Sequence, residues 1–194
     1  MVKEIFKDLD LSEMECKTAG DKFKRVTVKK GEILLNAGQY VPYQYYVYSG
    51  CLRSYFLNDS GKDHTMQFAV NNWWISDYSA FFNETRSVLY IECLQDAEIY
   101  QISKKSLEQL YSEVPVIESY FRVRMEKSFV SFQNRILSDL AMSAKEKYCW
   151  FITRYPSIEQ KIKNYHVASY LGITTESLSR IRKDLTRNKN LKIL

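Results

Sequence analysis

The chain has 194 residues, of which 45% are hydrophobic and 26% charged, with a formal net charge of +5. This composition is ordinary for a globular protein, and no run approaches the roughly 18 consecutive apolar residues of a membrane-spanning helix. The first eight residues carry charges where a signal peptide would need an apolar run, so we expect a cytoplasmic protein without a membrane partner.

Residues 23–102 contain short β-branched and aromatic runs separated by single glycines at positions 31, 38, 50 and 61. Such spacing is typical of an all-β sandwich or barrel. The Asn-Asp-Ser-Gly sequence at 58–61 predicts a tight turn, because Asn, Asp and Gly tolerate the positive φ that hairpins require. The runs predict seven strands, at residues 24–28, 33–35, 45–48, 52–57, 64–70, 87–93 and 97–102.

Residues 116–140 predict one long helix, for which Pro115 suits the first turn. Apolar residues recur at spacings of three and four as far as Leu140, which places them in one stripe on the helix surface. A helix of about 25 residues is long against a mean of about 11–12, and its stripe needs either the chain's own core or a second copy as a partner. We favour a homodimer, with an interface formed by Phe121, Met125, Phe129, Phe132 and Ile136.

The segment Ser143-Ala-Lys-Glu146 has the form of a capping box, in which the Ser hydroxyl accepts from an amide three residues on and the Glu reaches back. It predicts a helix that runs to about Arg154. The pair Tyr155-Pro156 should end that helix, because a residue before proline disfavours the α region. Residues 157–160 predict a short helical turn or linker.

Residues 164–185 predict two short helices around a turn. In the first helix Asn164 is a candidate cap, and Val167, Ala168, Tyr170 and Leu171 supply a packed face. Gly172 stands where the sharp turn needs a residue free to adopt positive φ. Thr174 is the candidate cap of the second helix.

The second of these helices has two unlike faces. Leu178, Ile181 and Leu185 lie at i, i+3 and i+7, so they face the core, and the opposite face is hydrogen-bonding and net positive. Arg can bind guanine bidentately and Glu can accept from the cytosine amino group, while Glu176 and Arg180, one turn apart, can order each other. The face predicts contact with the major groove of double-stranded DNA. Its members are Thr174, Thr175, Glu176, Ser177, Ser179, Arg180, Arg182 and Lys183.

The net charge agrees with this interpretation. Residues 1–110 hold 13 basic and 15 acidic side chains, whereas residues 111–194 hold 15 and 8. A basic C-terminal part suits a phosphate-backbone partner, because each neutralised phosphate releases condensed counterions. A solvated basic tail would give the same charge distribution, so charge alone leaves both interpretations open.

The chain resembles the cyclic-AMP receptor protein and Fnr (Crp/Fnr) family of bacterial transcription regulators. The resemblance rests on Lys-Gly-Glu-Ile at 30–33 with Ala-Gly at 37–38, Val-Tyr-Ser-Gly-Cys-Leu-Arg at 47–53, the glycine at 61 and residues 167–181. In this family the recognition helix begins with a short polar or basic residue, then Glu, then Arg four positions later, and Thr175, Glu176 and Arg180 occupy those places. The resemblance implies a homodimer whose recognition helices, about 34 Å apart, read a palindromic site. It also implies a small-molecule effector of unknown identity, and RNA polymerase as a candidate partner.

The family's cyclic-nucleotide pocket is matched only in part. Its signature is Gly-Glu followed about ten residues later by Arg-Ser or Arg-Thr, where Glu binds the ribose and Arg the cyclic phosphate. Arg86 and Ser87 match and are the candidate effector-binding residues, but Ile75 and Ser76 stand where Gly-Glu should be. We therefore expect an effector other than cyclic AMP, and for Arg86 we favour a surface or structural salt bridge.

Other chemistries have little material in this sequence. The four cysteines lie 35 or more positions apart, and His64 and His166 are the only histidines. A cupin-type metalloenzyme, the rival from another class, needs two or three histidines that converge on one metal. We expect no enzyme, no catalytic residue, no metal and no cofactor. A ligand-binding or interaction module with a degenerate DNA-binding domain is the alternative that stays open.

The expected fold class is α+β. It comprises an N-terminal double-stranded β-helix domain (jelly-roll, cyclic-nucleotide-binding-like) at residues 1–115, a dimerisation helix at 116–140 and a helix-turn-helix DNA-binding domain at 141–194. Residues 190–194 suffice for one strand at most. We therefore expect the β-hairpin wing that many relatives place beside the recognition helix to be reduced or absent.

Overall fold

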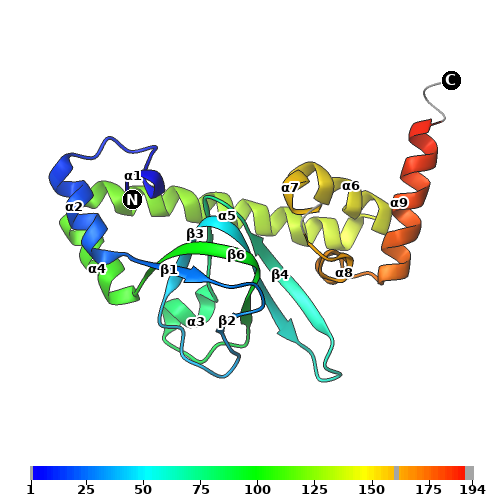
Figure 1. Cartoon of the computed structure of the whole chain (residues 1–194), viewed down its shortest axis with the longest axis horizontal. Coiled ribbons are helices and arrows are strands. Elements are labelled where there is room, and N and C mark those ends of the chain that lie inside the picture. Colours follow the sequence, from blue (N-terminus) through cyan, green and yellow to red (C-terminus); the bar gives the residue numbers. More distant parts are fainter. Residues whose placement is uncertain (1, 160–161, 191–194) are drawn as a thin grey trace.

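Helix α5 (Pro115–Ala141) runs along most of the length of the molecule, and the other elements pack around it (Figure 1). The computed structural model describes residues 2–159 and 162–190. The strands lie along the middle of α5 (Figure 1). Three helices surround its first turns, namely α1 (Val2–Ile5), α2 (Glu13–Lys22) and α4 (Lys104–Glu113). Four helices lie at its end, namely α6 (Ala144–Arg154), α7 (Pro156–Glu159), α8 (Asn164–Leu171) and α9 (Thr175–Asn190).

All strand pairs of the sheet are antiparallel. Its main path is β1-β6-β3-β4, while β2 pairs with β6 and β5 pairs with β3. The strands are β1 (Lys24–Val28), β2 (Ile33–Leu35), β3 (Gln44–Leu57), β4 (Asp63–Ala69), β5 (Trp73–Ile75) and β6 (Tyr90–Ile102). The combination of an antiparallel sheet with separate helices confirms the expected mixture of α and β structure.

The predicted strands at residues 24–28 and 33–35 are confirmed at both ends. The predicted break at Gly50 is wrong, because β3 continues through it as one strand. Gly50 adopts φ 97°, and a Cβ atom there would lie 2.6 Å from the Asp96 carbonyl oxygen and 2.7 Å from Ala97 Cα. The glycine thus permits a close approach of β3 to β6. The two strands predicted at 87–93 and 97–102 likewise form one strand, β6, which begins only at Tyr90.

Five short elements are absent from the sequence prediction: β5, α1, α2, α4 and α3 (Tyr78–Asn83). Helix α2 nevertheless has a signal in the sequence, a capping box in which the Glu15 amide donates to Ser12 Oγ and the Glu15 carboxylate accepts from the Ser12 amide. Strand β5 and helix α3 are each too short for a periodic pattern.

Side chains on the two faces of the sheet belong to two different buried clusters. Tyr45 and Val47 of β3 point into the interior, where a buried apolar cluster fills the space between the strands. Tyr46, between them, points to the opposite face and joins the cluster beneath α1, α4 and α5. The interior cluster consists of Val28, Leu35, Tyr45, Val47, Leu52, Ala69, Ile75, Ile91, Cys93, Ala97 and Ile99.

The capping box predicted before α6 is confirmed. Ser143 Oγ accepts from the Glu146 amide at 3.4 Å, and the Glu146 carboxylate accepts from the Ser143 amide at 2.8 Å. Helix α6 ends at Arg154, and α7 is the short helical turn that was expected after it; position 160 of that prediction lies outside the described residues.

Helix α9 is longer than predicted and extends to Asn190. No strand lies between Gly172 and Asn190, so this part of the chain contains no wing. Residues 191–194, on which the last predicted strand falls, lie outside the described residues.

Candidate nucleic-acid interface

Helices α8 and α9 are joined by a three-residue turn, as predicted. Gly172 follows α8 with φ 67° and ψ 28°, in the left-handed region, and its amide donates to the Ser169 carbonyl at 3.3 Å. The amide of Ile173 donates back to the Ala168 carbonyl at 3.0 Å. These bonds close the C-terminal end of α8 and reverse the chain, which is the role expected for the glycine.

The two predicted helix caps have different outcomes. Thr174 caps α9 as predicted, because its Oγ1 accepts from the Ser177 amide at 3.2 Å. Asn164 does not cap α8: the preceding residue, Lys163, takes the cap position, and Asn164 is the first residue of the helix. Asn164 Oδ1 instead accepts from Arg182 Nη1 at 2.5 Å and so connects α8 to α9.

The apolar face of α9 lies where the sequence predicts it. Leu178 is fully buried, and Ile181 and Leu185 are partly buried against the same aromatic cluster of α6 and α8. The opposite face is open to solvent. Its exposed members are Thr174, Glu176, Ser179, Arg180 and Lys183, and Thr175 and Ser177 are partly exposed.

Arg182 is placed differently from the other predicted DNA contacts. Its Nη2 lies 2.7 Å from Glu159 Oε1, and its Nε donates to Tyr148 Oη at 3.0 Å. Together with the Asn164 contact, these bonds engage three sides of the guanidinium within the chain. The side chain therefore fixes α9 on α6, α7 and α8 and does not extend into solvent with its neighbours.

Glu176 and Arg180 do not order each other in the way the sequence suggests, since no ion pair of 4 Å or less joins these two described residues. The Glu176 carboxylate accepts from Thr175 Oγ1 at 3.1 Å. Hydrogen bonds from its own amide and from the Thr174 and Thr175 hydroxyls hold the pKa of Glu176 below its ordinary value. Arg180 is exposed and forms no ion pair with the described part of the chain.

Helix α8 docks on strand β4. Ser169 Oγ accepts from the Thr65 amide at 2.8 Å and donates to the Asp63 carbonyl at 3.1 Å. Phe68 of β4 packs against Tyr170 with ring centroids 5.3 Å apart. The C-terminal helices thus contact the sheet through both hydrogen bonds and aromatic packing.

Arg135 of α5 holds this junction from a third side. Its guanidinium donates to the carbonyls of Met66, of Thr65 at 3.0 Å and of Tyr170 at 3.1 Å, and it lies 4.0 Å from the Tyr170 ring centroid. Sequence reasoning missed Arg135, because a single Arg in a long helix carries no signal of the carbonyls it meets. It connects α5, β4 and α8 directly.

An ion-pair network centred on the buried Arg53 lies under α8. Arg53 bonds to Asp63 at 2.7 Å and to Glu92 at 2.8 Å. Burial alone would raise the pKa of Asp63, but hydrogen bonds from Arg53 and Ser169 hold it below its ordinary value. Burial, and then the nearby Arg53 charge, lower the pKa of His166 to about 4, so this histidine is neutral at pH 7.

The apolar stripe predicted on α5 divides between the chain's interior and its surface. Phe121 is 7% exposed and packs against Trp74 with ring centroids 4.9 Å apart, so it belongs to the chain's own core. Phe129 is 64% and Ile136 59% exposed, and Met125, Phe132 and Leu140 are also exposed. Val116, Val123, Val130 and Leu137 are exposed as well and recur every seven residues, a signal that sequence reasoning missed.

The candidate effector residues Arg86 and Ser87 both bond to other parts of the chain. Arg86 Nη1 donates to the Gly38 carbonyl at 2.6 Å, and its guanidinium lies over the Tyr40 ring. Ser87 Oγ donates to Asp77 Oδ2 at 2.8 Å. Their partners are a carbonyl, a ring and a carboxylate of the chain itself, and the salt bridge favoured for Arg86 is not among the ion pairs of the described residues.

Residues 2–159 and 162–190 contain no group of three or more His, Cys, Asp or Glu placed to hold a metal ion. Across the same residues, no helix combines the length and the apolar character needed to cross a membrane.

Comparison with known proteins identifies the sheet region. Residues 25–114 match the cyclic nucleotide-binding domain family. The chain is 25% identical over 169 residues to the regulatory protein HlyX of Actinobacillus pleuropneumoniae, a match that covers 81% of this chain and 70% of that protein. It is 23% identical over 171 residues to the anaerobic regulatory protein of Haemophilus influenzae, which covers 81% and 65%. The curated relatives are regulatory proteins, as the resemblance implies.

Solved structures extend the match along the chain. The TM-score is 0.74 with the c-di-GMP-responsive global regulator CLP of Xanthomonas campestris, at 13% identity over 92% of this chain and 93% of that one. It is 0.75 with FixK2 of Bradyrhizobium japonicum, at 17% identity over 86% of both chains. A Crp/Fnr-family chain from Eubacterium rectale gives 0.70 at 22% identity over 95% and 87%. These likenesses show the fold, and with the curated relatives they confirm the resemblance to Crp/Fnr regulators.

Proposed function

We propose that the whole chain is a homodimeric transcription regulator of the Crp/Fnr type that binds double-stranded DNA through α9. The match of residues 25–114 to the cyclic nucleotide-binding domain family and the similarity to regulatory proteins support this proposal. One observation carries the proposal. The exposed face of α9 is polar and basic, while its opposite face is anchored through the buried Leu178. A rigidly held helix with a free hydrogen-bonding face is what entry into a major groove requires.

The side chains of this face have distinct roles in the proposal. Arg180, free and exposed, donates both guanidinium edges to guanine O6 and N7. Glu176, ionised at neutral pH, accepts from a cytosine amino group. Lys183 and the hydroxyls of Ser177 and Ser179 contact phosphates. The Thr174 hydroxyl bonds to Ser177 and the Thr175 hydroxyl bonds to Glu176, so these two side chains order the first turn of α9. Arg182, already engaged by Glu159, positions α9 and does not contact a base.

The dimer in this proposal forms along α5. The exposed apolar side chains Phe129 and Ile136, with Met125 and Phe132, would cover the same residues of a second copy. Phe121 fixes α5 on its own sheet and makes no contact with the partner. The proposal keeps the division expected from the sequence: a β-roll sensor domain at 1–115, a dimerisation helix at 116–140 and a helix-turn-helix DNA-binding domain at 141–194.

DNA binding is tested by fluorescence anisotropy with a labelled duplex of random sequence. We expect affinity to fall by about 10³–10⁵ between 50 and 200 mM salt if six to ten phosphates are contacted. Lys183→Gln should reduce the slope of log K against log salt by about 1, and Lys105→Gln on α4, exposed but far from α9, should not. Affinity that does not depend on salt would favour the alternative, a ligand-binding or interaction module without DNA.

The dimer is tested by sedimentation velocity. Phe129→Asp combined with Ile136→Asp should convert a dimer to monomers, because two charges cannot be buried in an apolar interface without partners. Met14→Asp with Val88→Asp is the matched control, since both of these apolar residues are exposed at 72% and neither belongs to α5. A monomeric wild-type chain, or an unchanged dimer in the α5 variant, would contradict the interface.

From the resemblance to the Crp/Fnr family we also propose a small-molecule effector other than cyclic AMP, and contact with RNA polymerase. The expectation that the effector is not cyclic AMP is supported by Ile75 and Ser76, which stand where the family has Gly-Glu, and by Ser87, whose hydroxyl is engaged by Asp77. The effector would act by shifting the population between two arrangements of the recognition helices, transmitted through α5.

A further inference from the structure

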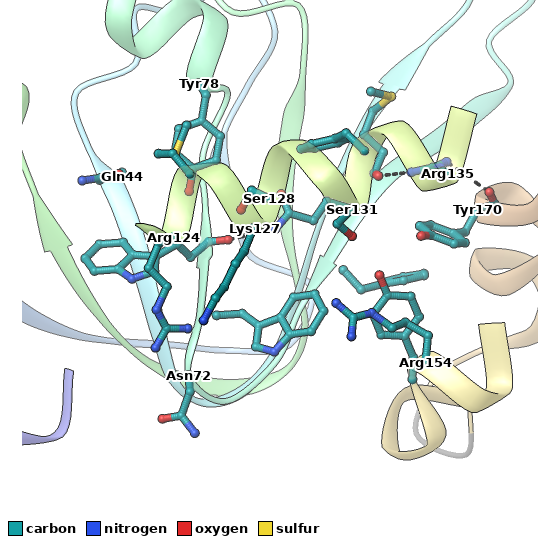
Figure 2. A pocket seen from close by; sticks show the side chains of 18 of the residues that line it. Gln44, Asn72, Tyr78, Arg124, Lys127, Ser128, Ser131, Arg135, Arg154 and Tyr170 are labelled. Carbon is teal, nitrogen blue, oxygen red and sulfur yellow. Dashed lines mark hydrogen bonds between the residues drawn. The ribbon is translucent and has the colours of Figure 1, made fainter. Parts of the chain in front are cut away.

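A cavity of about 350 Å³ lies between α5, the outer face of β4 and β5, and the C-terminal helices (Figure 2). Its volume is at the lower end of the range of about 300–1,000 Å³ that is typical of small-molecule sites. Aromatic side chains from three regions line it: Trp73 and Trp74 of the sheet, Phe121 and Phe132 of α5, and Tyr155 and Tyr170 of the C-terminal helices. The site is therefore assembled at the junction of the sheet region, α5 and the C-terminal helices.

The lining is strongly positive. It contains four cations, Arg124, Lys127, Arg135 and Arg154, and no carboxylate. Arg135 is engaged by backbone carbonyls and Arg124 lies 3.6 Å from Asp8, whereas Lys127 and Arg154 form no ion pair within residues 2–159 and 162–190. In Figure 2, Arg124 and Lys127 extend from α5 to the same side, and Arg154 approaches from α6. The cavity thus places uncompensated positive charge beside aromatic rings.

Two hydrogen-bond donors in the lining are also unsatisfied. Gln44 is 2% exposed, and its side-chain amide nitrogen has no hydrogen-bond partner among the described residues. The buried indole nitrogen of Trp74 likewise has none. Buried donors are normally paired, so these two mark a place where an acceptor from outside the chain would be stabilised.

The cavity is separate from the position of the family's nucleotide motif. Arg86 and Ser87 do not line it. Along β3, Tyr45 and Val47 point into the filled interior of the sheet, whereas Gln44 and Tyr46 lie on the other face, beneath α5. A molecule in this cavity would contact the outer face of the sheet and the C-terminal helices directly.

We propose that this cavity binds an amphipathic organic anion, with a small aromatic or planar body and one carboxylate, phosphate or sulfonate group. The body packs among Trp73, Trp74 and Tyr155, and the anionic group pairs with Lys127 and Arg154. Because Lys127 lies on α5 and Arg154 on α6, the bound anion connects the two helices. That the anion regulates DNA binding rests on the proposed function; that it binds does not.

The probe is 8-anilinonaphthalene-1-sulfonate, measured by its fluorescence, with N-phenyl-1-naphthylamine as the same aromatic body without charge. The full-length wild-type chain should bind the sulfonate saturably, with one site per protomer. Lys127→Gln with Arg154→Gln should lower the affinity for the sulfonate at least tenfold and leave the affinity for the neutral amine unchanged. The matched control, Lys17→Gln with Lys105→Gln, removes two exposed cations that do not line the cavity and should leave both affinities unchanged.

A second variant locates the site. Ser131→Trp would fill the cavity from α5 and should abolish binding of both probes. The proposal is overturned if the wild-type chain shows no saturable binding, or if Lys127→Gln with Arg154→Gln leaves the affinity for the sulfonate unchanged. It is also overturned if this variant weakens both probes equally, or if the control variant weakens the sulfonate as much. Neither measurement uses DNA, so a failure of DNA binding by α9 would leave this test intact.

Discussion

Two regions of the chain match the motifs of one family but differ in whether their polar groups are available. At the Arg86-Ser87 corner of the sheet, the Ser87 hydroxyl bonds to Asp77 and Nη1 of Arg86 bonds to the Gly38 carbonyl. On α9, Arg180 and Lys183 extend into solvent without an ion pair in the described part of the chain. A motif residue can therefore bind a ligand only through the hydrogen-bonding groups that the fold leaves free.

The interior of the sheet strengthens this contrast. Ile75 stands where the family places glycine, and it is completely buried in the interior cluster. The side chains that fill this space, among them Val47 and Leu52, are also completely buried. The α9 face and the cavity beneath α5 are, by contrast, places where donors remain without acceptors.

The largest loss of stability should come from substitution of Asp77, whose carboxylate binds the Ser87 hydroxyl at the sheet corner. It accepts from Ser87 Oγ at 2.8 Å, from the Ala80 amide at 3.1 Å and from the Val88 amide at 3.3 Å. Asp77→Ala should lower the free energy of unfolding by about 3 kcal/mol, because it removes a helix cap and leaves buried donors unpaired. Chemical denaturation measures this.

Asp59→Ala, at an exposed turn position, is the control and should change the stability by less than about 0.5 kcal/mol. If Asp77→Ala were equally mild, the Ser87 hydroxyl would be available after all, and the contrast with α9 would weaken.

The next effect separates two arginines of α9. Arg180→Ala should cost about 1–3 kcal/mol of binding to a selected duplex and relax the base preference at one position per half-site. Arg182→Ala should instead lower the free energy of unfolding by about 1–2 kcal/mol, because it breaks the contacts with Glu159 and Tyr148. Anisotropy and denaturation on both variants measure this. If Arg180→Ala lost the same affinity for every DNA sequence, the result would contradict a contact between Arg180 and a base.

A pH effect tests the contact between helix α8 and the sheet. His166 has a pKa of about 4 in the folded chain against an ordinary value of 6.5, and it faces Arg53, Asp63 and Lys163. The unfolded chain therefore binds the proton more tightly, so this stability is complete above about pH 6.5 and is lost as the pH falls toward 4. Denaturation should show a loss of about 1–2 kcal/mol between pH 7.5 and 5. His166→Gln should remove most of that loss, and an unchanged pH dependence would contradict the assignment.

The smallest effect is expected at Arg86. Arg86→Gln should leave DNA affinity unchanged and alter stability by about 0.5 kcal/mol or less, because the side chain is exposed and bonds to one carbonyl. Isothermal titration with cyclic AMP should show no binding to either form. Binding to the wild-type chain that disappears in the variant would show that the sheet corner is a nucleotide site.

The sequence predicts best where a local pattern determines local structure. The Ser143 capping box, the Gly172 turn and the Thr174 cap each depend on residues within a few positions, and all three are confirmed. Gly50 misled the strand prediction, because its role is a close approach to residues 96 and 97, distant in sequence.

The sequence predicts which residue types form the exposed face of α9, but not which of these side chains are free to contact a ligand. The spacing of α9 correctly separates Leu178 from Arg180, yet it cannot show that Arg182 reaches Glu159 and Tyr148. Similarly, the stripe of α5 places Phe121 with Phe129, although the first lies in the chain's own core. Both distinctions depend on packing between segments far apart in the chain, as does the cavity lined by Arg154.

The most direct test of the central claim is a selection of bound sequences from random DNA, by purified protein at about physiological salt and with no ligand added. The account predicts a two-fold symmetric motif with half-sites one helical turn apart, and loss of preference at one base pair per half-site in Arg180→Ala. Failure to enrich any sequence, with or without cell extract, would contradict the claim that α9 is a DNA-reading surface.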